Sequence, residues 1–342
     1  MKKILTLCIA ACCSTVVMAQ SDSQPYSTKS LSGDAINNVV VTTSAGGILV
    51  SGADGQAPRI EVYIKGQNNR KLSNEEIQKR LDADYDMNIA VNGHELDATV
   101  KNKHDNMDWK NGLTISFKIY VPREVSTNLK TSGGGIQLDN LKGDENFATS
   151  GGGLAIDKLT GTIKGRTSGG GITVANSGSD IDLQTSGGGI VAQNCTGNIK
   201  LITSGGGIEL NHLDGSITAK TSGGGIAGKH ITGELVAGTS GGGVDLKDMD
   251  CALDAVTSAG SVNVEMNHVG KYLKLNTSAG NIALKLPAKQ GFDLNLTADK
   301  IEGDASGNFN GTWGKNNVNG SVNGGGIPVD AHASSNISVS FN

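Results

Sequence analysis

The stretch Thr131-Ser132-Gly133-Gly134-Gly135-Ile136 decides the fold, because its Thr-Ser pair returns along the chain every eighteen residues. The pair recurs at positions 149, 167, 185, 203, 221, 239 and 257. A fixed interval of this length is typical of a repeat protein, in which each copy stacks on the next. We number the eighteen positions of a copy as columns, starting from the Thr.

In two parts of each copy, apolar residues occupy every second column. Columns six and eight hold Ile136 and Leu138 in the first copy and mostly aliphatic residues in the others. Columns fifteen and seventeen repeat the pattern, as at Ile199 and Leu201. A period of two with one apolar face is typical of a half-buried strand. Each copy is therefore predicted to contain two short strands.

Corners are expected between these strands. Column eleven is mostly apolar and column thirteen is mostly Gly, as at Leu213 and Gly215. The Gly triplet of columns three to five and the glycine of column thirteen permit positive φ values and close backbone approaches. We therefore expect each copy to turn at least twice and to return beneath its own start.

One copy is too small to bury a core of its own, so its strands must pair with those of the next copy. The predicted fold is all-β, a single-stranded β-helix or β-solenoid with 18-residue rungs. At about 4.8 Å per rung, the segments from Thr131 to Thr297 form a rod of roughly 40 Å.

The sequence outside the repeats divides into four further regions. Residues 1–19 contain Lys2, Lys3, an apolar run and a final Ala19, which indicates a cleaved secretory signal peptide. Around the solenoid, predicted for 128–300, we expect a flexible lead over 20–32, a β-rich N-terminal cap over 33–127, and a C-terminal loop with closing strands over 301–342.

One short helix is predicted inside the cap. Ser73 and Glu76 have the spacing of a capping box, and Ile77, Leu81 and Tyr85 follow at intervals of four residues on one helix face.

The N-terminus predicts export to the periplasm, the outer membrane surface or the extracellular space. An alternative is lipid anchoring at Cys12, because Ile9-Ala10-Ala11-Cys12 resembles a lipobox, although the apolar stretch before it is short. No other run approaches the roughly 20 apolar residues of a membrane helix, so the mature chain is expected to have no transmembrane span.

Charge and cysteine content narrow the function classes. Without Lys2 and Lys3 the chain has 27 basic and 33 acidic residues, and no basic face or tail is visible, which argues against a nucleic acid partner. Cys195 and Cys251 lie three rungs apart, about 14 Å at the rung spacing, whereas a disulfide needs Cα atoms within about 7 Å. They are expected to remain unpaired.

The repeats resemble the bacterial adhesin-like family of secreted β-strand-repeat proteins of unknown function. The resemblance lies in Ser44-Ala45-Gly46-Gly47 after a Val-rich strand, in the strand ending Tyr120-Val121-Pro122, and in the tandem Thr-Ser-Gly-Gly-Gly-Ile copies. It covers about residues 35–342. It implies a β-solenoid at the bacterial envelope, and no family catalytic motif or cofactor is implied for any residue.

Column ten holds the sharpest candidate site. His212 and His230 occupy it in successive copies and Asp248 occupies it in the next, so the three side chains are expected to stack at about 4.8 Å per step. Two imidazoles and a carboxylate are ligands that zinc or copper accepts. The alternative is a solvated turn column, since its other members include Asn140 and Lys158.

Two further features allow both a structural and a functional interpretation. The stacked Thr and Ser hydroxyls either satisfy backbone groups at the corner or present a regular surface to a ligand. Asp180, Asp182 and Arg166 are the nearest approach to the charged cluster of a polysaccharide lyase or hydrolase, but the copies offer no second Arg and no aromatic platform.

The sequence thus predicts an exported, non-catalytic β-solenoid, acting as an adhesin or as a cell-envelope interaction scaffold. Its expected partners are a glycan, a matrix component or an envelope protein, and no cofactor is expected. The alternatives are a polysaccharide-processing β-helix enzyme and a periplasmic metal-binding protein that uses His212, His230 and Asp248. The oligomeric state is left open.

Overall fold

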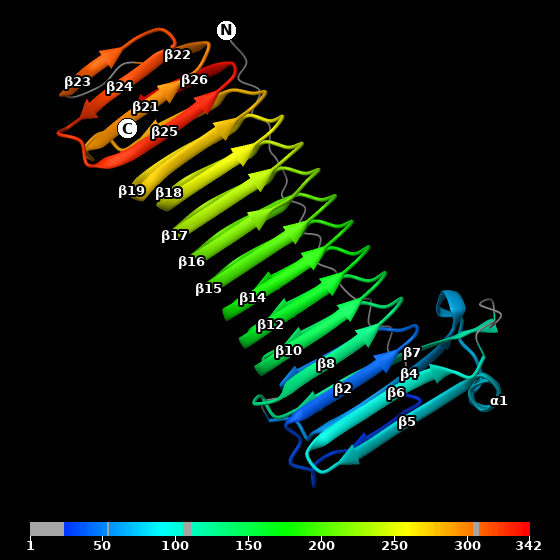
Figure 1. Ribbon diagram of the computed structural model, residues 1–342. Helices are drawn as coiled ribbons and strands as arrows, with labels where there is room; N and C mark the ends of the chain where they lie inside the picture. The colour runs from blue at the N-terminus through cyan, green and yellow to red at the C-terminus, as the bar shows by residue number, and fades with distance from the viewer. Residues whose placement is uncertain (1–23, 53–54, 105–110, 304–307) are drawn as a thin grey trace, which may run out of the picture.

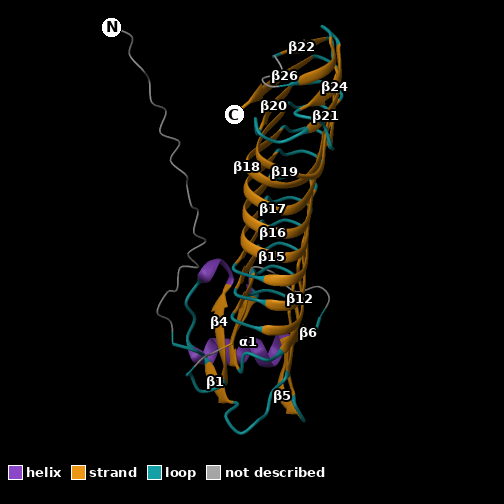
Figure 2. Cartoon of the chain, turned by 90° about the vertical axis from the view of Figure 1, so that its left-hand side faces the viewer, coloured by secondary structure: helices purple, strands orange, loops and turns teal. Residues whose placement is uncertain are grey.

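The protein is a rod of stacked β-rungs with one helix at its N-terminal end, as shown by a computed structural model that describes residues 24–52, 55–104, 111–303 and 308–342 (Figure 1). The predicted all-β solenoid is confirmed. Each regular rung contributes one strand to each of two faces. Face 1 carries columns six to nine, and face 2 carries columns twelve to eighteen together with the Thr that opens the next copy. Figure 2 shows the rungs as flattened loops stacked along the rod.

The regular rungs pair in parallel and in register, one copy apart. Leu154 lies beside Ile136 on face 1, and Thr149 lies beside Thr131 on face 2. The strands of the first rungs are β8 (Ser126–Thr131), β9 (Ile136–Asp139), β10 (Lys142–Thr149), β11 (Leu154–Asp157), β12 (Thr160–Thr167), β13 (Ile172–Ala175) and β14 (Gly178–Thr185).

In the later rungs one strand continues through the column-ten corner from face 1 to face 2. These strands are β15 (Ile190–Thr203), β16 (Ile208–Lys220), β17 (Ile226–Thr239), β18 (Val244–Thr257) and β19 (Val262–Thr277). The longer copy from Thr257 to Thr277 is accommodated by register shifts between β18 and β19.

The core lies between the two faces and is built from the predicted columns. Ile208 and Leu210 of columns six and eight are buried, as are Ile199 and Leu201 of columns fifteen and seventeen. Column eleven is buried as well, including Cys195, and both cysteines that the structure describes are unpaired, as predicted.

The glycines act differently from one column to another. The column-thirteen glycines have the expected positive φ except Gly143, for example 129° at Gly215. The triplet glycines from 133 to 243 have no positive φ, so that part of the prediction is wrong. Their middle member is needed for close approach instead, because a Cβ at Gly188 would lie 2.3 Å from the carbonyl oxygen of Gly170 in the preceding rung. The sharp left-handed turn falls in column ten.

The predicted helix is confirmed as α1 (Asn74–Asp84), which follows a short 3-10 turn, η1 (Gln67–Asn69). The backbone N–H of Glu76 donates to the Ser73 hydroxyl at 3.2 Å, as in an N-cap. Ile77 and Leu81 are buried, but Tyr85, which was predicted on the same helix face, lies beyond the end of the helix and begins the extended strand β5 (Tyr85–Asn92).

The N-terminal strands contain two further rungs whose spatial order differs from their order in the chain. Residues 38–52 form a rung that lies between the first regular rung and a rung formed by β6 (Glu95–Asn102) and β7 (Leu113–Val121). Two antiparallel strands, β5 and β4, close the ends of the two faces, and β1 adds to β4. The strands here are β1 (Ser27–Ser30), β2 (Asn38–Thr43), β3 (Ile48–Gly52), β4 (Arg59–Gly66), β5 (Tyr85–Asn92), β6 (Glu95–Asn102) and β7 (Leu113–Val121).

The flexible lead predicted over 20–32 is wrong for its C-terminal part. Ser27–Ser30 form the edge strand β1 and Leu31 is fully buried. The four β1 residues are exposed and polar, which is the composition expected at a sheet edge and carries no apolar signal.

The C-terminal strands are also intercalated. Strand β25 lies between β19 and β21, and β26 lies between β20 and β22. The closing strands predicted over 301–342 therefore form an interior rung, and the loop predicted before them contains a hairpin, β23–β24, whose β24 pairs antiparallel with β21. The strands are β20 (Ile282–Leu286), β21 (Phe292–Thr297), β22 (Lys300–Glu302), β23 (Phe309–Trp313), β24 (Asn317–Val322), β25 (Ile327–Ala333) and β26 (Asn336–Phe341).

Candidate functional site

The Thr column of the repeat is a buried structural ladder. Thr203 is 2% exposed, and its hydroxyl donates to the carbonyl oxygen of Gly188 in the preceding rung at 2.7 Å. The same bond recurs at 2.7 Å from Thr149 to Thr277. The hydroxyls thus satisfy corner backbone groups, which confirms the structural interpretation for the Thr column.

Column ten is the left-handed corner of each rung. Its members have φ between 50° and 54°; they are Asn140, Lys158, Asn176, Asn194, His212, His230 and Asp248. Asn, Asp and His are the residues other than Gly that most readily adopt this conformation. The backbone geometry therefore accounts for six of these seven residue types without a ligand, and Lys158 is the exception.

The structure stacks the two histidines but does not gather a complete ligand set. The imidazole centroids of His212 and His230 lie 4.6 Å apart, and Nδ1 of His230 lies 3.9 Å from the Asp248 carboxylate. Lys229 Nζ lies 3.8 Å from the same carboxylate, so a metal ion would have to compete with this ammonium group for the carboxylate. Within the described ranges, no group of three or more His, Cys, Asp or Glu side chains could hold a metal ion.

The carboxylates of face 2 are engaged in pairs between rungs. The Asp182 carboxylate lies 3.5 Å from Lys200 Nζ and 3.9 Å from the Arg166 guanidinium. Asp180 accepts a hydrogen bond from the Asn198 side chain at 2.8 Å. The hollow above them is shallow, about 270 Å³. This arrangement stabilises the stacking of rungs, and no acid–base pair stands out from it.

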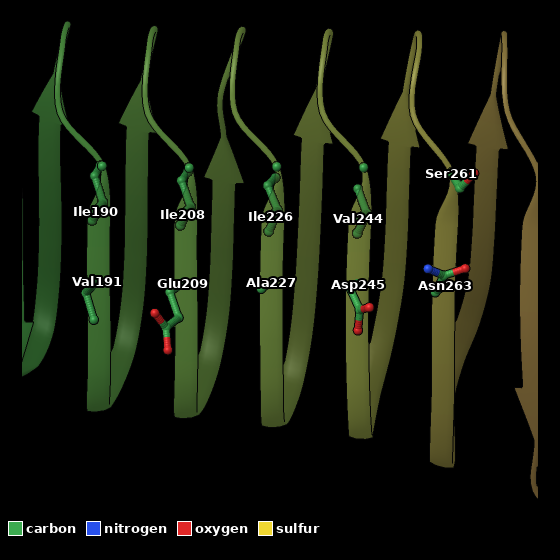
Figure 3. Close-up of a pocket in the computed structure, with 14 residues that line it drawn as sticks. Ile190, Val191, Ile208, Glu209, Ile226, Ala227, Val244, Asp245, Ser261 and Asn263 are labelled. Carbon is green, nitrogen blue, oxygen red and sulfur yellow. The ribbon is translucent and has the colours of Figure 1, made fainter. Parts of the chain in front are cut away.

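An open groove of about 610 Å³ lies on face 1 (Figure 3). It crosses strands β15 to β19, so it runs along the rod and across the strands. One side follows column five, which is Gly in four rungs and Ser261 in the fifth, and the other follows column seven. The column-seven residues are Val191, Glu209, Ala227, Asp245 and Asn263.

The two acidic side chains of this groove each have a partner on their own strand. Asp245 lies 3.4 Å from Lys247 Nζ, and Glu209 accepts a hydrogen bond from the Asn211 side chain at 2.9 Å. Aliphatic Val191 and Ala227 alternate with them along the groove. The result is a shallow surface of aliphatic and acidic side chains, which suits an extended partner better than a small enclosed substrate.

Sequence reasoning missed a buried carboxyl group at the start of the regular rungs. Glu145 is 1% exposed, and the Thr127 hydroxyl donates to its Oε2 at 2.5 Å. Its Oε1 is the one buried side-chain oxygen or nitrogen without a hydrogen-bond partner in the part of the chain that the structure describes. Burial raises the pKa of this carboxyl from 4.5 to about 7. The signal was present in the sequence, because Glu145 occupies column fifteen, where later copies have Ile or Leu.

Two predictions concern the membrane. The signal peptide predicted for residues 1–19, and the alternative anchor at Cys12, lie outside the described residues. Across 24–52, 55–104, 111–303 and 308–342, no helix is long and apolar enough to span a bilayer.

A family model supports the resemblance that the repeats predicted. Residues 55–340 match the family described as Toastrack DUF4097. The chain belongs to the Toastrack DUF4097 family. The Toastrack DUF4097 match begins after the intercalated rung of residues 38–52 and includes the regular rungs and the intercalated C-terminal strands up to residue 340. It confirms a family whose function is unknown.

Among curated proteins, nothing matches this Toastrack DUF4097 chain. Three solved structures resemble it weakly. A putative cell adhesion protein from Clostridium sporogenes has 11% identity and a TM-score of 0.20, with 92% of this chain and 98% of that chain covered. A putative lipid binding protein from Parabacteroides distasonis has 14% identity and a TM-score of 0.28, covering 93% and 98%. A putative adhesin from Bacteroides fragilis has 11% identity and a TM-score of 0.22, covering 92% and 95%. At these TM-scores the likeness carries no argument about activity.

Proposed function

We propose that this Toastrack DUF4097 protein is an exported, non-catalytic scaffold that binds partners through the flat faces of its rod. The observation that carries the proposal is the groove of face 1, which is open along its whole length and crosses five consecutive rungs. A surface that repeats with each rung suits a glycan, a matrix component or an envelope protein that extends along the rod.

The pairing and burial of the carboxylate side chains support a binding role over catalysis. General acid–base chemistry needs a carboxyl or imidazole aimed at a site that can enclose the reacting bond. Asp180 and Asp182 are paired with neighbouring rungs, and Glu145 is buried in the core and lines neither the groove of face 1 nor the hollow beside Asp182. The exported location in this proposal rests on the predicted signal peptide.

A binding screen beside a degradation assay tests the proposal. Purified residues 20–342 are applied to a glycan array and to matrix proteins, and the same preparation is incubated with polysaccharides and assayed for new reducing ends. Saturable binding without new reducing ends supports the scaffold. New reducing ends that disappear in Asp182→Asn, but persist in the matched face-1 variant Asp245→Asn, would overturn it in favour of the enzyme.

A further inference from the structure

Column nine of face 1 changes sign along the rod. Asp139 and Asp157 occupy it near the N-terminal end, and Lys229 and Lys247 occupy it toward the C-terminal end. The paired strands place these residues in one row. Gln193 is the midpoint of the row, because Asp157 and Lys229 are each two rungs from it, and Asp139 and Lys247 are each three rungs from it.

In column seven, residues at equal distances from the same midpoint have complementary side chains. Val191 occupies the central rung, and Ala155 and Ala227 lie two rungs away on either side. Thr173 and Glu209 lie one rung away, and Gln137 and Asp245 lie three rungs away, so each carboxylate corresponds to a side chain that can donate a hydrogen bond. Column five adds no side chains, because it is Gly from 135 to 243.

We propose that face 1 is a self-complementary interface on which a second copy of this chain packs face to face, with the two rods antiparallel. The twofold axis runs along the strand direction through the rung of Val191 and Gln193. This operation keeps each column opposite itself and reverses the order of the rungs, as in an isologous dimer. Asp157 then faces Lys229 of the partner subunit, and Asp139 faces Lys247 of the partner subunit.

The charges select this register over its neighbours. Each of the two ion pairs occurs twice across the axis, and no like charges meet in columns seven or nine between Ser51 and Glu265. Moving the axis half a rung toward the C-terminus would place Asp139 opposite Glu265 of the partner subunit, and like charges opposite each other are costly. With parallel rods, column nine would face the glycines of column five, and the pairs would be lost.

The existing partners of these charges do not prevent the contact. Lys229 Nζ lies 3.8 Å from Asp248, and Lys247 Nζ lies 3.4 Å from Asp245. Asp157 lies 3.2 Å from Lys158 Nζ. All are exposed pairs, which contribute little to stability and exchange partners readily.

The area predicts a weak, salt-sensitive dimer. Nine rungs at about 4.8 Å and strands four residues wide give a face of about 500 Å² per chain, so about 1,000 Å² in total, which is near the lower limit of specific interfaces. We therefore expect dissociation in the micromolar range and a weaker dimer as salt screens the four ion pairs.

Sedimentation of charge variants tests the inference, which rests on the proposed function only in treating face 1 as a contact surface. Wild type is expected to shift from monomer to dimer over the micromolar range at low salt. Asp157→Lys alone and Lys229→Asp alone should weaken the dimer at least tenfold. An equimolar mixture of the two should regain it, because each chain then meets an opposite charge. Lys220→Asp, an exposed reversal on face 2, should have no effect.

Crosslinking tests the register separately. The described native cysteines are buried, so a short bismaleimide should join Val191→Cys chains to each other. It should join Ala155→Cys chains only to Ala227→Cys chains.

A chain that stays monomeric at low salt, a dimer that neither reversal weakens, or Ala155→Cys chains that join each other would overturn the inference. Ligand binding by a monomer would leave the scaffold function standing. Absence of any ligand with an intact dimer would remove that function and leave the dimer.

Discussion

Replacing Glu145 by Gln should stabilise the rod above neutral pH and leave it unchanged in acid. The carboxyl is buried in column fifteen with one oxygen bonded to Thr127 and the other without a partner. A charge in this position is costly because the surrounding core cannot solvate it. Burial is the main cause of the raised pKa, and the nearby charge of Asp144 adds to it.

The magnitude follows from the difference in proton affinity between the two states. The pKa is 4.5 in the unfolded chain and about 7 in the folded one, and each unit corresponds to about 1.4 kcal/mol. Below pH 4.5 both states are protonated and Glu145 carries no ionisation penalty. Between pH 4.5 and 7 the unfolded chain releases its proton while the folded chain keeps it, so stability falls as pH rises, by about 3 kcal/mol in all.

Urea unfolding followed by circular dichroism at pH 4, 6 and 8 measures this loss. Glu145→Gln keeps an acceptor for Thr127 and has no proton to lose, so it should be more stable than wild type by about 3 kcal/mol at pH 8 and equal to it at pH 4. Glu209→Gln, an exposed carboxyl on face 1, is the matched control and should keep the wild-type profile. If Glu145→Gln retains the wild-type dependence on pH, the carboxyl does not titrate in the core and the reasoning fails.

Four further predictions test the rungs and the ends. Gly188→Ala should lower the urea midpoint strongly, because its Cβ would lie 2.3 Å from a carbonyl oxygen, whereas Gly238→Ala, whose nearest neighbour is 3.8 Å away, should not. Thr203→Val removes a 2.7 Å bond to Gly188 and leaves a partly buried carbonyl without its donor, which should cost about 1–3 kcal/mol in the same assay. His230→Val forces a β-branched residue to φ 54° and should lower the free energy of unfolding by about 1–2 kcal/mol, while His230→Asn should leave it unchanged. Zinc titration by calorimetry separates the two interpretations of this residue. Equal heats for wild type and His230→Asn would support the corner role, and a loss of heat in the variant would support a metal site. Deleting residues 327–342 removes the rung between β19 and β21, so hydrogen exchange should become fast in β20 to β22 and stay slow in β12; uniform protection would contradict the intercalated order.

The regular part of the fold could be predicted because its signal is local and repeated. Burial of columns six, eight, fifteen and seventeen follows from a period of two within each copy, and one copy after another places them in register. The helix could be predicted for the same reason, since Ser73 and Glu76 are near neighbours in sequence. The left-handed corner could not be placed, because column ten offers no glycine and its Asn, Asp and His residues have other uses.

The ends of the rod and the groove of face 1 could not be predicted, because they depend on contacts between strands that are not neighbours in the sequence. Strand β25 resembles any other alternating strand, and nothing local shows that it pairs with β19 on one side and β21 on the other. Parallel pairing leaves no hairpin signal of the kind that would fix a neighbour. The groove of face 1 arises from glycines beside column seven, so its residues were visible in the repeat, but its openness depended on how closely the rungs stack.

The intercalated ends of the rod differ from its central rungs in the order in which their strands can pair. Because residues 38–52 lie between later strands, and residues 327–341 lie between earlier ones, neither end can be completed by adding rungs in the order of synthesis. The central rungs carry no such constraint, since each contacts only its neighbours one copy away. A duplication or loss of one central copy would therefore change the length of the rod by one rung and leave both intercalated ends unchanged.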